Sequence, residues 1–350
     1  MPATWTLRRT TPLALLLGLL LAACEGGGTE PTPPLDERAV VLNSLEVSLT
    51  VFSTEDPGSI TTVGLAPEGS PVTLAATAEH AVVPLGFVSA VAIVDLTEAR
   101  VVTTIALPPG SGATGVAFAS ASTAVVANPS RGTVSPVNVV TRMAEPEIAV
   151  GTYPQAVVRV GNRVAVLNGG LGPDFQPAEP GSVAVLDALT LEVRGTVTLS
   201  GENPGAAAVG PGGRLYVVNS GRFGAADGSL SVVDLVTLRE LEHHEGFGEF
   251  PYAAAFGPDG LLYVGSFGYG VAVWDPAGDA FVRSPDDAIE PEGIPSVSGL
   301  GFDAQGRLYT LRPDCSEPSV ANRLGGAFEV DLQVPVGICP IALVFAPPSG

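Results

Sequence analysis

The chain has 350 residues, of which 46% are hydrophobic and 15% charged, so it can bury a large core in two ordinary domains or in one repeat-built domain. Its 36 acidic residues outnumber its 16 basic residues and give a net charge of −20. Such a field repels nucleic acid and anionic membranes, which excludes nucleic-acid binding and leaves solubility or cation affinity as its uses. Every basic residue is an arginine, so no lysine amine is available for Schiff-base or general-base chemistry.

The N-terminal residues resemble a bacterial lipoprotein signal. Arg8 and Arg9 form a basic region, residues 13–22 form an apolar run, and the sequence LAAC at 21–24 places small residues before Cys24. The apolar run is about half as long as a membrane-spanning helix. The resemblance implies cleavage before Cys24, attachment of lipid to this cysteine and retention at a membrane of the cell envelope. An ordinary secretory signal is the alternative, and it would leave Cys24 as an odd thiol in an oxidising compartment.

The segment that follows is rich in glycine and proline, EGGGTEPTPPLD at 25–36, and shows no apolar period. This composition is typical of a flexible tether. We therefore expect a signal peptide over 1–23, a lipid anchor and tether over 24–37, and a folded domain over 38–350.

From residue 39 onward, short runs of Val, Ala and Leu are bounded by Gly, Pro, Asn and Asp, a pattern that predicts an all-β domain. One phrase recurs about every 40–50 residues, which is the period of a four-stranded propeller blade. It consists of an apolar strand, a Gly turn, a strand ending near Asn, a loop, a strand ending in Asp, and a last strand leading to Pro. The predicted second strands lie at 40–43, 81–85, 124–128, 164–168, 216–219, 262–266 and 308–312. The predicted third strands lie at 91–96, 135–140, 183–190, 230–237, 271–275 and 328–332.

These phrases resemble the YVTN-type β-propeller repeat, in which a strand ending in Asn, an SVID-like strand and an I-x-V-G-x-x-P element follow in order. IAVGTYP at 148–154 and VPVGICP at 334–340 match the last element. RLYVVNSGRFGAADGSLSVVDLVT at 214–237 matches the middle of the repeat. The first, second and last units depart from the pattern. The resemblance implies a β-propeller over most of residues 39–350.

The two ends of the domain predict how the ring closes. The chain ends with one inner-type strand, IALVFAP at 341–347, and begins with three strands at 39–43, 47–52 and 60–65, which together make one blade. Six complete units are expected at 71–112, 113–153, 154–203, 204–250, 251–296 and 297–339. The prediction is one seven-bladed β-propeller closed by pairing of the N- and C-terminal strands. Two separate β-domains are the alternative.

With Cys24 lipidated, Cys315 and Cys339 remain as an even pair in an exported protein, and we expect them to form a disulfide. In the repeat register, Cys315 follows the second strand of its blade, and Cys339 lies where the fourth strand leads into the next blade. Both positions belong to the same face of a propeller. The bond would hold the lead-in to the closing strand at 341–344.

Few residues are candidates for catalysis or metal binding. His80 lies in a predicted turn, and His243 and His244 end a fourth strand, where neighbouring side chains point to opposite faces and do not share one ion. The loops at 172–182 and 224–229 carry acids among glycines without the EF-hand spacing, so we interpret them as surface loops. No cofactor is predicted, and calcium stays open. The aspartates that end the third strands are interpreted as turn-forming, namely Asp95, Asp187, Asp234, Asp275 and Asp331.

The loops after the second strands and the crossovers before the first strands share one end of a propeller, which we call the loop face. The arginines and aromatic residues expected there suit recognition of sugars, peptides or carboxylates. For the asparagines, closure of a turn is the alternative role. The residues placed at or near the loop face are Arg131, Tyr153, Asn168, Asn219, Arg222, Phe223, Phe250, Phe267, Tyr269, Arg312 and Asp314.

Two functions are compatible with these patterns. The first is a non-enzymatic lipoprotein, monomeric and attached to the membrane through the Cys24 lipid alone, that presents its loop face to an envelope protein, peptide or glycan. The alternative is a propeller hydrolase of the lactonase or sugar-acid type, with carboxylates and a divalent cation near the central channel. The acidic surplus favours the hydrolase, but no acidic residue recurs at the ends of the inner strands, where such ligands gather.

Overall fold

The computed structural model of the protein describes residues 1–4 and 36–348. Residues 36–348 form one compact unit. The predicted signal, Cys24 and most of the tether lie outside the described residues. Within the described part of the chain, no helix is long and apolar enough to cross a membrane.

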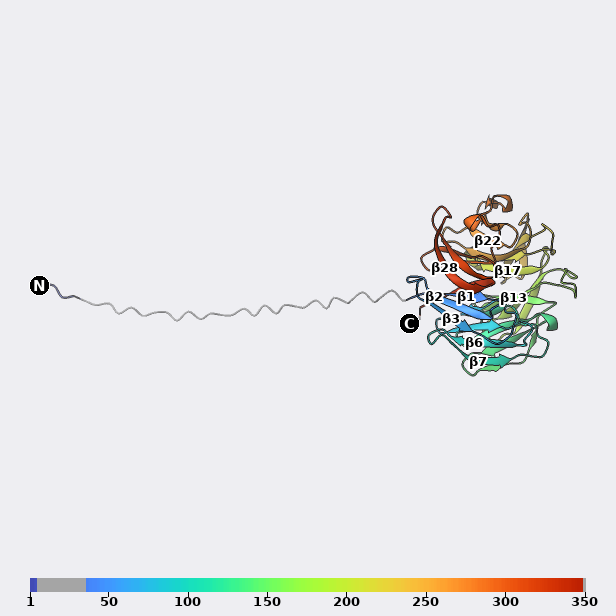
Figure 1. Ribbon diagram of the computed structural model, residues 1–350, viewed down its shortest axis with the longest axis horizontal. Coiled ribbons are helices and arrows are strands. Elements are labelled where there is room, and N and C mark those ends of the chain that lie inside the picture. The colour runs from blue at the N-terminus through green and yellow to red at the C-terminus, as the bar shows by residue number, and fades with distance from the viewer. Residues whose placement is uncertain (5–35, 349–350) are drawn as a thin grey trace. The chain divides into compact units, whose positions relative to one another are not determined.

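The compact unit consists of seven antiparallel sheets arranged as the blades of a β-propeller (Figure 1). Each of the six expected complete units contains one sheet. Along the chain, the first complete blade contains β4 (Ala75–Ala76), β5 (His80–Pro84), β6 (Ala90–Asp95) and β7 (Arg100–Ala106). The next contains β8 (Val116–Phe118), β9 (Thr123–Asn128), β10 (Thr133–Asn138) and a fourth strand in two pieces, β11 (Met143–Ala144) and β12 (Ile148–Ala149).

Three further blades follow the same order. The third complete blade contains β13 (Pro154–Val160), β14 (Arg163–Asn168), β15 (Ser182–Asp187) and β16 (Val193–Thr198). The fourth contains β17 (Pro204–Val209), β18 (Leu215–Asn219), β19 (Ser229–Asp234) and β20 (Arg239–Glu245), and the fifth contains β21 (Pro251–Phe256), β22 (Leu262–Ser266), β23 (Gly270–Asp275) and β24 (Ala280–Arg283). The last complete blade contains β25 (Gly299–Phe302), β26 (Leu308–Leu311), β27 (Pro318–Leu324) and β28 (Val330–Ile338). Short 3₁₀ helices lie at Pro129–Arg131, Pro211–Gly213, Pro285–Asp287 and Pro291–Gly293.

The seventh blade joins the two ends of the domain. It contains β29 (Pro340–Ala346), β1 (Arg38–Asn43), β2 (Ser48–Ser53) and β3 (Ile60–Gly64), in that spatial order. β29 pairs antiparallel with β1, from Arg38 opposite Ala346 to Asn43 opposite Pro340. In Figure 1 the red C-terminal strands accordingly lie beside the blue N-terminal ones. The predicted seven-bladed ring and its closure are confirmed, because the pairing of β29 with β1 completes the seventh four-stranded blade from both ends of the domain.

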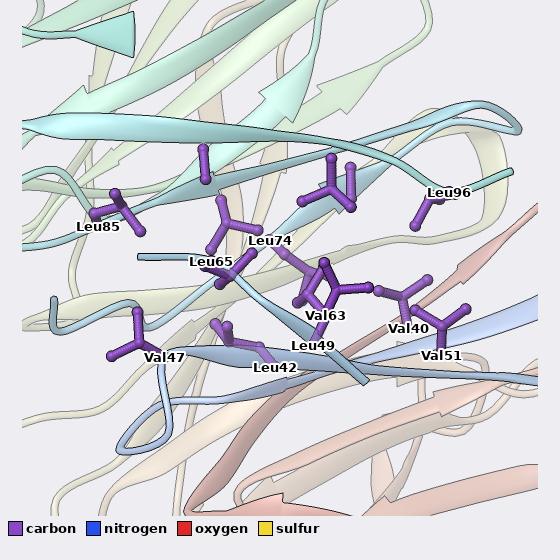
Figure 2. Close-up of a cluster of buried hydrophobic side chains, with 14 of the residues drawn as sticks. Val40, Leu42, Val47, Leu49, Val51, Val63, Leu65, Leu74, Leu85 and Leu96 are labelled. Carbon is purple, nitrogen blue, oxygen red and sulfur yellow. The ribbon is translucent and has the colours of Figure 1, made fainter. Parts of the chain in front are cut away.

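The apolar runs become strands because each blade packs between two neighbours. The middle strands are buried on both faces, as in β1, whereas the fourth strands such as β3 are largely exposed. Seven clusters of buried aliphatic and aromatic side chains lie within the described residues, one at each seam between blades. Figure 2 shows the seam at which Val40, Leu42 and Leu49 of the closing blade meet Leu74 and Leu85 of its neighbour. The core is therefore a ring of inter-blade layers.

The last complete blade departs from the sequence prediction. Residues 328–332, predicted as its third strand, instead enter the fourth strand, β28, and the third strand is β27. The strands are joined through Gly325, whose N–H donates to the carbonyl of Glu329 (2.8 Å). β27 was missed because its sequence, PSVANRL, contains Asn and Arg and does not end in Asp. Alternating exposure along β28 is typical of an outer strand.

This shift changes the role of one recurring aspartate. Asp331 lies in the fourth strand and pairs with Arg323 across the sheet (2.8 Å), so its interpretation as a turn residue was wrong. The other four carboxylates accept backbone N–H bonds from the residues two or three positions later and close the turns after the third strands, as predicted: Asp95, Asp187, Asp234 and Asp275.

Candidate functional site

The loop face is assembled by hydrogen bonds between the loop after a second strand and the crossover that leads into the first strand. The N–H of Gly169 donates to the carbonyl of Tyr153 (2.8 Å), and the N–H of Ser220 donates to the carbonyl of Asn203 (2.9 Å). Because the strands of each blade are antiparallel, these segments meet at one end of the ring. They surround the mouth of the central channel.

The inner strands that form the channel walls consist mainly of Gly, Ala and Val, and these small side chains let neighbouring strands approach closely. The channel is therefore narrow. Its cavity measures about 210 Å³. Gly115 shows why small residues are required: a Cβ at this position would lie 2.6 Å from the Cα of Ala156 on the next inner strand. The channel lining is apolar side chains and backbone, with Thr73, Tyr252 and Ser298 as its side-chain hydroxyls.

A larger cavity of about 610 Å³, which we call the aromatic pocket, opens beside the channel mouth. It shares Val72, Tyr252 and Ile341 with the channel, so the two spaces are contiguous. Cavities of this size hold small ligands or a few peptide side chains. The pocket is lined by Val72, Gln155, Leu171, Asp174, Phe175, Gln176, Asn203, Phe223, Phe250, Tyr252, Phe267 and Ile341.

Four of the rings form a continuous wall. Phe250 lies parallel to Tyr252, with ring centroids 5.9 Å apart, and Phe267 contacts both at 6.3 and 6.1 Å. Phe223 meets Phe250 edge to face at 5.9 Å. These are the arrangements that aromatic quadrupoles prefer. Phe223 and Phe267 nevertheless remain 75% and 37% exposed, which leaves apolar surface open to a ligand.

Phe175 stands apart on the loop between β14 and β15 and is 64% exposed. Its ring meets that of Tyr153 edge to face at 6.2 Å. Burial raises the pKa of both Tyr153 and Tyr252 above its usual value, and for Tyr252 the neighbouring Tyr153 adds to this effect. Both phenols therefore stay neutral at physiological pH.

The residues around the mouth occupy repeated positions in the blades. Tyr153, Asn203, Phe250 and Cys339 each precede the proline that begins an inner strand, and all four have a left-handed backbone with φ between 45° and 58°. The residue after that proline lines the pocket in three blades: Gln155, Tyr252 and Ile341. The crossover geometry thus delivers the same two sequence positions of these four blades to the mouth.

Two amides hold the polar side of the pocket. Nε2 of Gln155 donates to Oδ1 of Asn203 (2.7 Å) and to the carbonyl of Pro204 (2.9 Å). Asn203 in turn donates to the carbonyl of Gly221 (3.1 Å). Both hydrogens of the Gln155 amide are thereby used, which orients its Oε1 as a hydrogen-bond acceptor.

The aromatic residues and arginines predicted at the site separate into three groups. Phe223, Phe250 and Phe267 come together in the aromatic pocket, and Tyr153 flanks it through Phe175. Tyr269 is 7% exposed and lies beneath the surface, against Gly248 and Pro285. The third group, the arginines, is engaged in ion pairs: Arg131 with Glu147 (2.7 Å), Arg222 with Glu202 (3.3 Å) and Arg312 with Glu292 (4.0 Å).

The repeated asparagines at the ends of the second strands are buried and bond to the third strands. Asn219 donates to the hydroxyls of Ser229 (3.2 Å) and Ser231 (2.9 Å). Asn168 donates to Ser182 (3.1 Å) and to the carbonyl of Val150 (3.1 Å). These side-chain amides hold the strands of a blade together and do not face the pocket.

Sequence reasoning missed Gln155, Asp174, Phe175, Asn203 and Tyr252. The signal that identifies Gln155, Asn203 and Tyr252 is their position next to the proline that ends the repeat phrase. Asp174 and Phe175 lie in the β14–β15 loop, which is longer than the corresponding loops of the other blades. No periodic pattern points to them.

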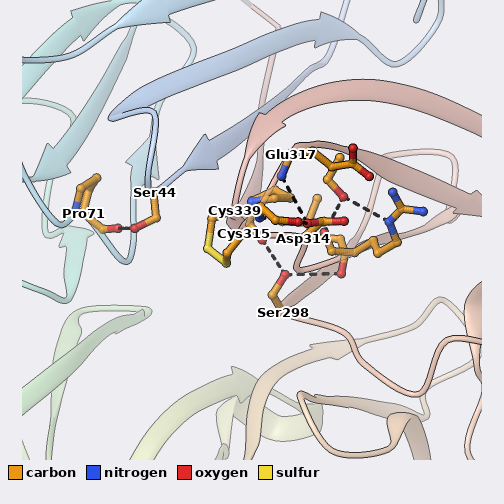
Figure 3. The surroundings of a disulfide bond; sticks show 12 residues. Ser44, Pro71, Ser298, Asp314, Cys315, Glu317 and Cys339 are labelled. Carbon is orange, nitrogen blue, oxygen red and sulfur yellow. Dashed lines mark hydrogen bonds between the residues drawn. A yellow bond between two sulfur atoms is a disulfide. The ribbon is translucent and has the colours of Figure 1, made fainter.

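The predicted disulfide is confirmed. The Sγ atoms of Cys315 and Cys339 are 1.98 Å apart, in the loop before β27 and at the junction of β28 and β29 (Figure 3). The N–H of Cys339 donates to the carbonyl of Asp314 (2.6 Å), and its own carbonyl accepts from the N–H of Ser44 (2.9 Å). Asp314 itself accepts from the N–H and hydroxyl of Ser316 and belongs to this turn. The bond therefore lies directly beside the closing strand.

The histidines do not form a common site. His243 lies 3.4 Å from the hydroxyl of Ser231, whereas His244 packs on Trp274 and lies 3.0 Å from the carboxylate of Asp279. His80 ends the turn that begins at Thr77. Within the described residues, no three His, Cys, Asp or Glu side chains gather closely enough to hold a metal ion.

Comparisons with known proteins agree on the architecture. No protein-family model and no curated protein matches the chain. Hydrazine synthase of Kuenenia stuttgartiensis is similar over 79% of this chain and 90% of its own, with a TM-score of 0.64 and 15% identity. A functionally unknown protein from Desulfotomaculum acetoxidans DSM 771 is similar over 89% and 99%, with a TM-score of 0.67 and 13% identity.

A third similar structure is virginiamycin B lyase from Staphylococcus aureus, over 79% of this chain and 91% of its own, with a TM-score of 0.59 and 11% identity. At these identities the likeness concerns the fold alone, because one propeller architecture serves many unrelated activities. The comparisons thus support the seven-bladed β-propeller fold. The aromatic pocket is built by the loops of this chain.

Proposed function

We propose that the protein is an envelope lipoprotein, anchored through Cys24, whose propeller binds a partner through the loop face. The observation that carries this proposal is the aromatic pocket: rings from separate loops converge on a cavity of about 610 Å³ while Phe175 and Phe223 stay 64% and 75% exposed. Exposing such rings costs free energy unless a ligand covers them. The lipoprotein-like signal and the resemblance to YVTN-type repeats support placement of this scaffold at the cell envelope.

The alternative, a hydrolase that uses a divalent cation, would require carboxylates aimed at the channel. The side chains that line the channel are instead aliphatic, aromatic or hydroxyl-bearing. Asp174 is the carboxylate that lines the neighbouring pocket, on an exposed loop. The arrangement of the mouth therefore favours binding of an apolar group over metal-assisted hydrolysis.

The pocket can be tested with a neutral probe. The chain from Glu25 to Gly350 keeps every described strand, and Nile red fluorescence reports its binding. Replacing Phe223 and Phe267 together by serine should weaken binding of the dye by about tenfold or more, the effect of losing two aromatic anchors. Unfolding by urea confirms that the variant retains its fold.

Phe87→Ser is the matched control. Phe87 is 65% exposed on the equivalent loop of the first complete blade, but it lines neither the pocket nor the channel. Dye binding should be unchanged in this variant. Equal affinities of the wild type and the Phe223/Phe267 variant would show that the pocket is not the binding site.

A further inference from the structure

We propose that the partner of the aromatic pocket is a basic polypeptide segment, which inserts an apolar side chain between the rings while its cations face the carboxylates of the loop face. This inference rests on the proposed binding function and adds the chemical identity of the ligand. Three features of the loop face carry it: its charge, the hydrogen-bonding character of the pocket, and the distribution of the acidic residues.

The first feature is that the loop face is acidic where it surrounds the pocket. Asp174 lies in the pocket, Glu179 is in the same loop, Asp227 is in the loop that carries Phe223, and Glu249 precedes Phe250. All four are exposed and have no ion pair within residues 36–348.

Arginine does not offset this charge. The arginines predicted at the loop face, Arg131, Arg222 and Arg312, are each within 4.0 Å of a glutamate carboxylate. The remaining field around the pocket is negative and repels an anionic ligand such as a carboxylate or a phosphate.

The second feature is that two polar groups of the pocket, the Gln155 amide and the Asp174 carboxylate, present oxygen acceptors, beside Gln176 and Tyr252, which can also donate. The two N–H groups of Gln155 are occupied by Asn203 and Pro204, so its Oε1 is the atom left for a ligand. Asp174 also offers oxygens only. An apolar group that carries an ammonium, a guanidinium or a peptide N–H satisfies these acceptors, and aromatic faces attract cations further.

The third feature distinguishes a polypeptide from a small amine. The carboxylates are distributed over the loops of several blades, from Glu179 beyond β14 to Glu249 before β21. A small amine placed among the rings meets one or two of them, whereas a chain with several basic residues meets many at once. The exposed rings also form a wall open to solvent, which suits the covering surface of a macromolecule.

The experiment uses one synthetic peptide in three versions that share the same phenylalanines and differ at intervening positions, which are arginine, glutamine or glutamate. Binding to the chain from Glu25 to Gly350 is measured by fluorescence anisotropy at low and high salt. The arginine version should bind about tenfold or more tightly than the glutamine version at low salt, and the difference should shrink as salt rises. An arginine version with serine in place of phenylalanine should lose most of its affinity.

Variants of the protein separate charge from apolar contact. Asp174→Asn combined with Glu249→Gln should lower the affinity for the arginine version severalfold more than the affinity for the glutamine version. Asp56→Asn, in the β2–β3 turn at the opposite end of the ring, is the control and should alter neither affinity. Phe223→Ser combined with Phe267→Ser should weaken binding of every version.

The outcomes distinguish this inference from the proposed function. Equal affinity for the three versions, lost in the Phe223/Phe267 variant, would overturn the basic ligand and retain the apolar pocket. Binding unaffected by the Phe223/Phe267 variant would overturn both. Phenethylamine binding as tightly as the arginine peptide would replace the polypeptide by a small amine, and dimers in light scattering that disappear in the Phe223/Phe267 variant would replace it by a second copy of the chain.

Discussion

The buried asparagines at the ends of the second strands act mainly within one blade. Asn219 is buried at the end of β18 and supplies hydrogen bonds to two hydroxyls of β19, and Asn168 makes the corresponding bond in the preceding blade. An asparagine at the end of a strand is compatible with a turn or a ligand site as long as the sequence is viewed alone. Its burial decides the matter, because a buried amide must find partners within the protein.

Replacing Asn219 by alanine should therefore destabilise the protein. The hydroxyls of Ser229 and Ser231 lose their shared donor, and the expected loss in the free energy of unfolding is about 1–3 kcal/mol. Urea unfolding followed by tryptophan fluorescence measures this loss. Asn162→Ala, at an exposed turn, is the comparison and should change stability little. Equal stability of both variants would mean that the Asn219 amide contributes nothing to its blade.

The surroundings of Asp187 lower the pKa of its carboxyl. Backbone N–H bonds from Thr190, the Arg194 guanidinium and the N–H of Leu189 lower the pKa of this carboxyl from 3.8 to about 2. A pKa lowered by folding contributes stability above the unfolded value, and this contribution is lost as pH falls through the folded value. Its window thus lies between pH 3.8 and about 2.

The Asp187→Asn variant tests this linkage. Asparagine keeps an oxygen for the turn and loses the charge that pairs with Arg194. The wild type should be the more stable protein above about pH 4, by a small margin because the group is exposed, and the two should converge toward pH 2. Unfolding curves measured across this range provide the check. A constant difference at every pH would attribute the effect to the turn and not to the carboxylate charge.

At the scale of elements, the disulfide stabilises the strand that closes the ring. Cys339 leads directly into β29, and Cys315 lies in the loop before β27. The bond spans a sequence separation of 24 residues, and closing a loop of that length contributes roughly 3 kcal/mol in the chain-entropy model.

Replacing both cysteines by serine should lower the free energy of unfolding by about that amount, roughly 3 kcal/mol. The rate of amide hydrogen exchange should rise first in β29 and β1. These strands come from opposite ends of the domain, and their pairing closes the ring. A variant that exchanges uniformly faster around the whole ring would indicate global destabilisation without a local effect on closure.

The prolines that begin the inner strands explain how elements build the pocket. Each is preceded by a residue with a left-handed backbone, and this turn brings Phe250 and Asn203 to the channel mouth. The repeat motif had located these prolines correctly. It did not reveal that the flanking residues face a cavity, because that direction depends on how the crossover joins two neighbouring blades.

At the scale of the whole molecule, the proposed lipid on Cys24 would anchor the propeller to a membrane. Cys24→Ser should release the protein from the membrane fraction into the soluble fraction, because the lipid is the predicted attachment. Fractionation and labelling with a clickable fatty acid, compared with the wild type, measure both consequences. If the wild type is also found in the soluble fraction and carries no fatty-acid label, the N-terminal segment is an ordinary secretory signal.

The amino-acid sequence by itself determined the all-β class, the seven blades and the closing strand, because a repeat places equivalent apolar strands at a regular period that is visible without coordinates. It also paired Cys315 with Cys339 through their repeat positions. It failed where the repeat degenerates: β27 lacks the usual Asp ending, so Asp331 was assigned to the wrong strand.

Only the tertiary structure decided which residues form the aromatic pocket. Phe175, Phe223 and Phe267 come from three loops of different blades, and Gln155 with Asn203 holds the polar side between two inner strands. Their convergence depends on the ring geometry and on the conformations of the crossovers, which set directions that spacing along a chain does not encode. A repeat period can be read along the sequence, whereas a pocket is made by side chains that closure of the ring brings together.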